Sequence, residues 1–244
     1  MPREPDHAAA NETAPASDLL RAEAARYALL RRLSPALRHE AAAPLQPIAM
    51  AAIVLEKRMA TSTPELLPLR DGVQRLVRYA REAARGGLDL IAWLEPGRSG
   101  ASDRDDRPDH RPLGVLVQDV FSLLATPLGF EGFTLEAALA ADAAREMPVA
   151  PLRLLLPAGL LWLSDQAGPP GPLVLTTDQV AGLSVLRMSR RQGAPEKEKA
   201  DSLREPAYRR LSLAELQVLA RSEGLDLRRR EDGPQLSLEL ALPS

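Results

Sequence analysis

The chain has 244 residues, 45% of them hydrophobic and only 3% aromatic, which is enough for one large domain or two ordinary domains with aliphatic cores. The absence of cysteine excludes disulfides and thiolate metal sites, and three scattered histidines argue against a histidine-rich metal centre. A net charge of −2 gives no general nucleic-acid footprint, and no signal peptide and no apolar run of about 18 residues is found. We therefore expect a cytoplasmic protein that binds neither nucleic acid nor a membrane.

Residues 1–17 are rich in Pro, Ala and polar residues without periodicity, which predicts a disordered tail. Ser17-Asp18 is a candidate N-cap for a helix that runs to about Ala60, with bends expected at three prolines. This helix has a buried stripe at a spacing of three or four residues. The stripe consists of Leu30, Leu33, Leu37, Ala41, Leu45, Ile48, Ala52, Leu55 and Met59.

A second helix is predicted after a turn at TSTPELLP, where Thr63 can cap and Pro64 can occupy the first helical position. Its stripe consists of Leu69, Val73, Leu76, Ala80, Ala83, Gly87, Leu90 and Leu94. Residues 18–95 therefore form a helical hairpin, and two hairpins would close a four-helix bundle in a homodimer. The hairpin could instead pack on the second half of its own chain.

Residues 96–112 combine Pro, Gly and charge and indicate a linker that includes His110. From 113 to 244 the pattern alternates between helix and strand, with helices over 113–128, 148–167 and 211–224. Strands are expected at 133–139, 172–177, 182–189, 225–231 and 235–243, the last two joined by a turn at Asp232-Gly233. This order predicts an α+β fold in which a mostly antiparallel sheet is covered by helices as an α/β sandwich.

His39 lies off the buried stripe of the first helix and should face solvent. Pro44 follows five residues later and removes an N–H from the helix, at a cost of about 3 kcal/mol in a helix interior. The run of His39, Glu40, three alanines, Pro44 and Leu45 resembles the H-box of bacterial sensor histidine kinases. In that family the histidine carries a phosphoryl group, an acidic neighbour assists and the proline bends the helix. His39 could also be an ordinary surface histidine, and Glu40 an ordinary solvated glutamate.

The second half resembles, element for element, the ATP-binding domain that follows the dimerisation hairpin in histidine kinases, but its nucleotide motifs are not recognisable. Where that family has an N-box asparagine for magnesium, this chain offers Leu161 and Asp165, of which only Asp165 could touch a cation. Arg190 and Arg191 stand in place of an aspartate loop, and REPAYRRLSLAEL lacks the glycines of a phosphate lid. The resemblance thus implies a degenerate ATPase-like domain that binds no ATP.

A phosphoacceptor helix without an ATP site is similar to the dimeric histidine phosphotransferases of bacterial phosphorelays. The resemblance implies that His39 passes a phosphoryl group between receiver aspartates of response regulators, with Glu40 orienting the imidazole. The receiver would bring Mg²⁺, so this chain would bind no metal or other cofactor. We expect docking at Arg38, Gln46, Ala49 and Ile53. Residues 18–95 carry 12 Lys/Arg against 9 Asp/Glu, a net +3, and Arg31, Arg32 and Arg38 could form a cationic surround near His39, or simply be solvated.

Two alternatives remain open at this stage. The chain could be a non-catalytic dimeric pseudo-histidine-kinase adaptor that binds signalling proteins. It could also be an ATP-dependent kinase of unusual sequence.

Overall fold

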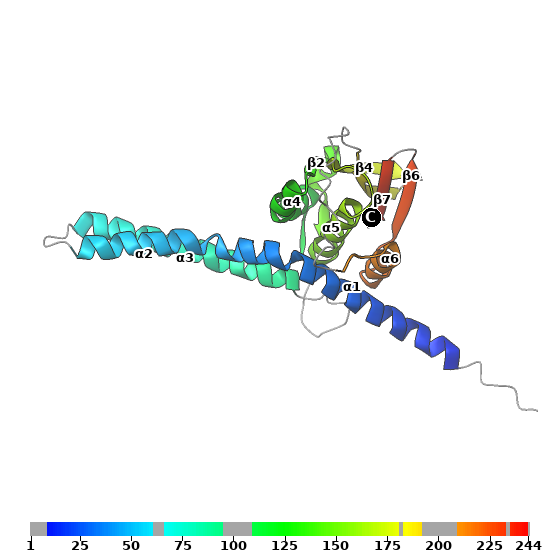
Figure 1. Cartoon of the computed structure of the whole chain (residues 1–244), viewed down its shortest axis with the longest axis horizontal. Coiled ribbons are helices and arrows are strands. Elements are labelled where there is room, and N and C mark those ends of the chain that lie inside the picture. The colour runs from blue at the N-terminus through cyan, green and yellow to red at the C-terminus, as the bar shows by residue number, and fades with distance from the viewer. Residues whose placement is uncertain are drawn as a thin grey trace, which may run out of the picture. The chain divides into compact units, whose positions relative to one another are not determined.

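The computed structural model describes residues 9–60, 66–94, 109–180, 183–191, 209–232 and 235–243. The chain divides into two compact units: a hairpin unit, Leu33–Pro96, and a sandwich unit, Met1–Arg32 together with Gly97–Ser244. Helix α1 (Ala9–Ala42) begins in the sandwich unit and ends in the hairpin unit. The chain is α+β, with a long helical hairpin followed by an α/β sandwich, as the sequence predicts (Figure 1).

The hairpin consists of α2 (Leu45–Met59) and α3 (Leu66–Leu94), which lie side by side (Figure 1). Close approach is possible at Gly72, where a Cβ would come within 3.1 Å of the Leu55 side chain. Near the turn, Arg58 Nη1 donates to the Pro68 carbonyl at 3.2 Å. The residues expected to cap α3, Thr63 and Pro64, lie outside the described residues.

The first helix is interrupted at Ala43 and Pro44, so α1 and α2 are separate elements. Prolines 44 and 47 explain the interruption, because neither has an N–H to donate to the carbonyls of Glu40 and Ala43 four residues earlier. In α2, Pro44 is the N-cap and Pro47 falls in the first turn, where backbone N–H groups have no helical acceptor in any case. Pro35, also expected to bend the helix, lies inside α1.

Two expectations for the start of α1 are corrected. The helix begins at Ala9 rather than after Ser17, so residues 9–17 of the predicted tail are helical. Alanine, the residue of highest helix propensity, recurs in this segment. Residues 18–32, expected to belong to the hairpin, are part of the sandwich unit instead. Their buried side chains are small or apolar: Ala22, Ala25, Ala28 and Leu29.

The sandwich unit is built on a five-stranded sheet in the order β2-β4-β5-β7-β6. The strands are β2 (Thr134–Ala138), β4 (Pro172–Val180), β5 (Leu183–Arg190), β6 (Leu227–Asp232) and β7 (Gln235–Ala241). Every neighbouring pair is antiparallel except β2 with β4, which is parallel. The mostly antiparallel sheet agrees with the sequence prediction.

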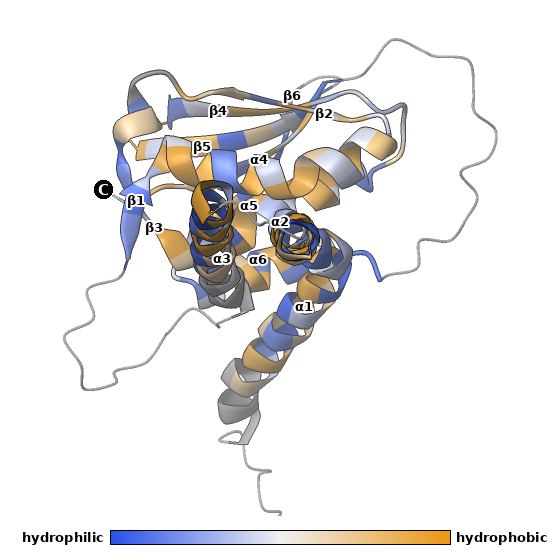
Figure 2. Cartoon of the chain, turned by 90° about the vertical axis from the view of Figure 1, so that its left-hand side faces the viewer, coloured by the Kyte–Doolittle hydropathy of each residue, from blue (hydrophilic) through white to orange (hydrophobic). Residues whose placement is uncertain are grey.

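Helices α4 (Leu113–Phe130), α5 (Val149–Ser164) and α6 (Leu213–Ser222) cover one face of this sheet (Figures 1 and 2). Twelve of the sixteen residues of α5 are buried, and a Cβ on Gly159 would lie 2.7 Å from the Met188 sulfur, so α5 packs very close to β5. Among the described helices, α4 alone is long and apolar enough to cross a membrane by length and composition; seven of its residues are buried in the sandwich core.

Three short elements of the sandwich unit were not predicted. Strand β1 (His110–Pro112) pairs antiparallel with β3 (Glu146–Pro148), and a short 3-10 helix, η1 (Ala140–Ala144), precedes β3. His110 was expected in the linker 96–112, but it pairs with Pro148 and remains exposed. The sandwich therefore begins before Leu113, and residues 96–108 of the predicted linker lie outside the described residues.

Candidate functional site

His39 lies in the last turn of α1 and is exposed, as its position off the apolar stripe predicts. Its carbonyl accepts the N–H of Ala43 at 2.9 Å, the last regular bond before the interruption at Pro44. The histidine therefore belongs to regular helix, which is interrupted four residues later at Ala43 and Pro44. The imidazole of His39 is accessible to a partner, and its backbone is held in the helix.

Glu40 is also exposed. Within the described part of the chain, the side chains of His39 and Glu40 make no hydrogen bond with each other. Adjacent residues of a helix project about 100° apart and do not face each other. An orienting contact from Glu40 to the imidazole thus requires a rotamer change or a bridging water.

The residues predicted to dock a receiver are all exposed and belong to the same unit as His39. Gln46 and Ile53 follow His39 at intervals of seven residues, or about two helical turns, and Ile53 keeps 46% of its surface exposed. Arg38 and Ala49 complete this exposed set. The hairpin unit therefore brings all six predicted site residues onto one exposed stretch.

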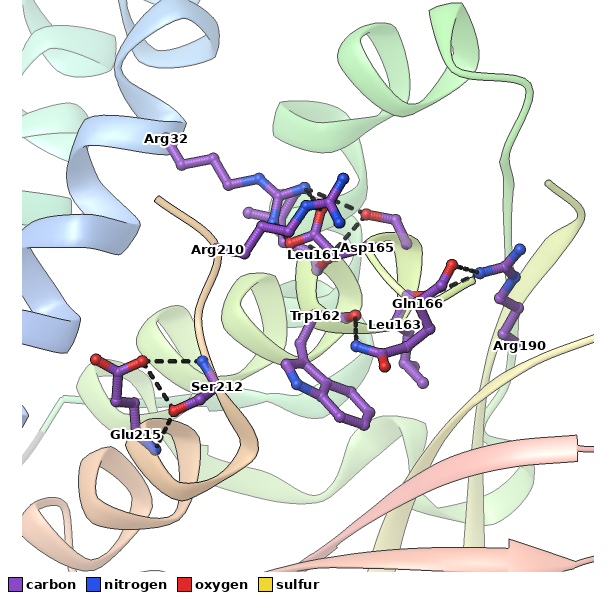
Figure 3. A network of polar contacts seen from close by, with 11 residues as sticks. Arg32, Leu161, Trp162, Leu163, Asp165, Gln166, Arg190, Arg210, Ser212 and Glu215 are labelled. Carbon is purple, nitrogen blue, oxygen red and sulfur yellow. Dashed lines mark hydrogen bonds and ion pairs between the residues drawn. The ribbon is translucent and has the colours of Figure 1, made fainter. Parts of the chain in front are cut away.

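Arg32 does not contribute to a cationic surround of His39. Its guanidinium forms a two-point ion pair with Asp165, the C-cap of α5, at 2.5 and 2.8 Å (Figure 3). It also donates to the Leu161 carbonyl at 3.1 Å and to the Ser164 hydroxyl at 3.3 Å. With side chains only 5% and 7% exposed, Arg32 and Asp165 are both buried. Arg31 and Arg38, in contrast, are exposed.

Asp165 is the one carboxylate that the sequence offered for a cation, and it is already occupied by arginines. Arg210 approaches the same carboxylate at 3.9 Å (Figure 3). Burial raises the pKa of Asp165, while the positive charges of Arg32 and Arg210 oppose that shift. A divalent cation at Asp165 would have to displace Arg32 from two hydrogen bonds. Within the described residues, no cluster of three or more metal-ligating side chains exists.

Arg190, which stands where an aspartate loop was sought, is a buried structural residue. Its guanidinium donates to the carbonyls of Leu163 and Gln166 at 3.3 and 2.7 Å (Figure 3). It also donates to the carbonyls of Gly168 and Pro169. Burial lowers its pKa. The ring of Phe133 lies 5.2 Å from the guanidinium carbon, within cation–π range. Arg190 thus holds together the loop after α5.

The segment before α6 also serves structure. Ser212 and Glu215 form a reciprocal capping box at the start of α6 (Figure 3). At the other end, Gly224 has a φ of +72°, and the N–H groups of Gly224 and Leu225 bond back to Arg221 and Ala220. These are the bonds of a Schellman motif, which agrees with the predicted cap at Gly224. Residues 204–208 of the lid candidate lie outside the described residues.

One flank of the hairpin is apolar and exposed in the single chain. None of the residues of α2 is buried, and its Leu45 and Met59 are 56% and 66% exposed. On α3, Val73 and Val77 are 49% and 42% exposed. In an antiparallel pair these positions lie on the same side of the contact between the helices. We call this surface, made of Leu45, Ala52, Met59, Leu66, Val73, Val77 and Ala80, the seam face.

No protein-family model and no curated protein matches the chain. It is similar to the solved Acinetobacter baumannii histidine kinase AdeS, with a TM-score of 0.41, 14% identity and coverage of 79% of this chain and 94% of that one. A histidine kinase from Burkholderia phymatum STM815 gives a TM-score of 0.42, 12% identity and coverage of 85% and 98%. A bacterial phosphotransferase gives a TM-score of 0.35 and 14% identity, with coverage of 87% of this chain and 95% of that one. Likenesses of this size leave the function to be argued from the chain's own residues.

Proposed function

We propose that this chain is a histidine phosphotransfer protein of a two-component phosphorelay, which passes a phosphoryl group between receiver aspartates of response regulators through His39. The proposal rests on the exposure of His39 together with the ion pair at Asp165. The histidine is exposed on a helix just before a proline interruption, while Asp165, the one carboxylate that could have held a nucleotide's cation, is bound by Arg32. A protein built in this way can exchange a phosphoryl group with a partner, while the Asp165 carboxylate is not free to hold the cation of ATP.

The chemistry uses only one nucleophile from this chain. The imidazole nitrogen of His39 that carries no hydrogen supplies an electron pair to phosphorus, and the bond from phosphorus to the receiver's carboxyl oxygen breaks. The electrons of the broken bond leave with the receiver aspartate, which becomes a free carboxylate. The other ring nitrogen keeps its hydrogen and becomes positively charged. A carboxylate such as Glu40 stabilises this charge, and the same steps run in reverse toward a second receiver.

Docking in this proposal uses Arg38, Gln46, Ala49 and Ile53, which present a mixed polar and apolar surface beyond His39. The receiver supplies Mg²⁺, which neutralises charge on the phosphoryl oxygens, so this chain contributes no metal ligand. The seam face is covered by a second copy of the chain in a four-helix bundle, because a hairpin alone leaves its apolar flank in water.

The test is transfer from a phosphorylated receiver domain to wild type, His39→Gln and His110→Gln. His110 is the matched control, since it is the other described exposed histidine. We expect His39→Gln to unfold within about 0.5 kcal/mol of wild type, as for other surface changes, yet to accept no phosphate. His110→Gln should accept phosphate at the wild-type rate.

Two outcomes would overturn the proposal. If His39→Gln still accepts phosphate, the acceptor is misassigned. If wild type accepts none from a panel of receivers, the chain is better described as a dimeric pseudo-kinase adaptor, whose exposed apolar surfaces serve protein binding alone.

A further inference from the structure

Helices α4, α5 and α6 of the sandwich unit share one feature at their C-terminal ends. The C-caps of α4, α5 and α6 are Glu131, Asp165 and Glu223, all of them acidic. The C-terminal end of a helix carries partial negative charge, so an acidic residue there is unfavourable unless a cation covers it. The sandwich unit thus gathers three carboxylates where helix geometry disfavours them.

Helix α1 supplies the missing cations. Arg32 pairs with Asp165 and also reaches the Leu161 carbonyl at the end of α5. Arg26, six residues earlier, forms an ion pair with Glu223, whose side chain is only 3% exposed. Desolvation raises the pKa of Glu131, and the charge of Arg32 only partly opposes that shift. Two arginines on one helix therefore pair with two of the three acidic caps, Asp165 and Glu223.

Apolar burial in this part of α1 comes mainly from small side chains. The buried apolar residues between Ala22 and Arg32 are three alanines and one leucine, Leu29. An alanine offers a single methyl group to a contact, so apolar burial per residue is small here. The Arg32–Asp165 side chains and the Glu223 side chain are each at most 7% exposed, whereas Arg26 keeps 20% of its side chain exposed. Removing an arginine would therefore leave a largely buried carboxylate without its cation. The attachment of this segment therefore depends strongly on two arginines.

We propose that residues 22–32 of α1 form a strap, latched to α5 and α6 by Arg32 and Arg26, that can detach as a unit from the sandwich. Arg32 lies seven residues before His39 on the same uninterrupted helix, α1. The latch then acts as a positioning device for the helix that carries the phosphoacceptor. This last step rests on the proposed function, whereas the latch itself does not.

The latch is tested by amide hydrogen exchange of the full chain. We expect residues 22–32 to exchange at least tenfold faster in Arg32→Gln than in wild type, and faster still in Arg32→Glu. The charge-swapped pair Arg32→Glu with Asp165→Arg should restore slow exchange. Glu23→Gln, at an exposed position of the same segment, should leave exchange unchanged. Unchanged exchange in a folded Arg32→Gln protein, or a swap that fails to restore protection, would overturn the latch.

The positioning role is tested by phosphoryl transfer in the same variants. Arg32→Gln should lower the maximal transfer rate to His39 several-fold without changing the receiver concentration at half-maximal rate, and the charge swap should recover the rate. If hydrogen exchange is accelerated but the transfer rate is unchanged, the latch stabilises residues 22–32 and the positioning role is wrong. If wild type accepts no phosphate, the proposed function fails, and the exchange measurement still decides the latch.

Discussion

Arg32 and Asp165 are 133 residues apart in the chain, and their side chains form a buried two-point ion pair at 2.5 and 2.8 Å. A guanidinium matches a carboxylate in this geometry better than a point charge does. Asp165 is the side chain that the sequence analysis identified as able to contact a nucleotide-bound cation, and Arg32 occupies its carboxylate.

The first prediction is that the chain does not bind Mg-ATP. Calorimetric titration with Mg-ATP should give no heat of binding beyond dilution, because Asp165 is held by Arg32 and the loop after α5 is held by Arg190. Asp165→Asn should give the same flat titration. Micromolar affinity in wild type that disappears in Asp165→Asn would revive the reading as an ATP-dependent kinase.

A second prediction concerns assembly. Light scattering at micromolar concentration should give twice the 26.4 kDa mass of one chain, because the seam face needs a second apolar surface. Val73→Glu places a charge on that face and should yield monomers. Arg75→Gln changes the net charge by the same amount at an exposed position on the opposite face of α3 from the seam face, and should remain dimeric. Monomeric wild type would remove the basis for a four-helix bundle.

Acid sensitivity of α6 provides a third prediction. Desolvation acts to raise the pKa of Glu215, but hydrogen bonds from Ser212 and the contact with Arg209 outweigh it, so the pKa is lowered from 4.5. A lowered pKa in the folded state means that this stabilisation is complete above pH 4.5 and is lost as the pH falls through the folded value. Denaturant unfolding should show Ser212→Ala less stable by about 1 kcal/mol at pH 7.

The matched comparison is between Glu215→Gln and Glu56→Gln, an exposed glutamate of α2. Glu215→Gln should reduce the loss of unfolding free energy between pH 5 and pH 3, whereas Glu56→Gln should not. An identical acid profile for both variants would mean that the capping box contributes nothing measurable.

The fourth prediction addresses docking. Ile53→Arg should weaken the affinity for a cognate receiver without dissociating the dimer, because Ile53 is exposed beyond His39 and outside the seam face. Leu183→Arg introduces the same charge at an exposed leucine of the sandwich unit and serves as the control. Surface plasmon resonance measures affinity, and light scattering measures assembly. Equal affinity for both variants would place the docking surface elsewhere.

Much of the fold could be predicted because its helices are long and periodic. The apolar patterns of 113–128, 148–167 and 211–224 match α4, α5 and α6, and β6 ends at Asp232 before β7 begins at Gln235, with the predicted turn residue Gly233 outside the described residues. Strands β1 and β3 could not be predicted, because three residues that end in proline show no alternation. The early start of α1 was missed because Pro and polar residues suggested a tail where alanine propensity prevails.

The candidate site divides in a similar way. The exposure of His39 follows from helical spacing alone, and its chemical role remains a prediction. The Arg32–Asp165 pair was missed, because an ion pair between residues so far apart in sequence leaves no local pattern. One indication was present: Arg26, Leu29 and Leu33 share a face, and Arg32 lies beside it, so charged residues border an apolar stripe. A basic residue on a buried stripe indicates an acidic partner elsewhere in the chain, because an unpaired buried charge is unfavourable.

The central claim is that His39 carries the phosphoryl group, and the most direct measurement is phosphorus NMR of the chain after incubation with a phosphorylated receiver. Our account predicts a single phosphohistidine resonance in wild type that is lost at acid pH, persists in base and is absent from His39→Gln. A resonance that persists in His39→Gln, or none in wild type with any receiver tested, would contradict it.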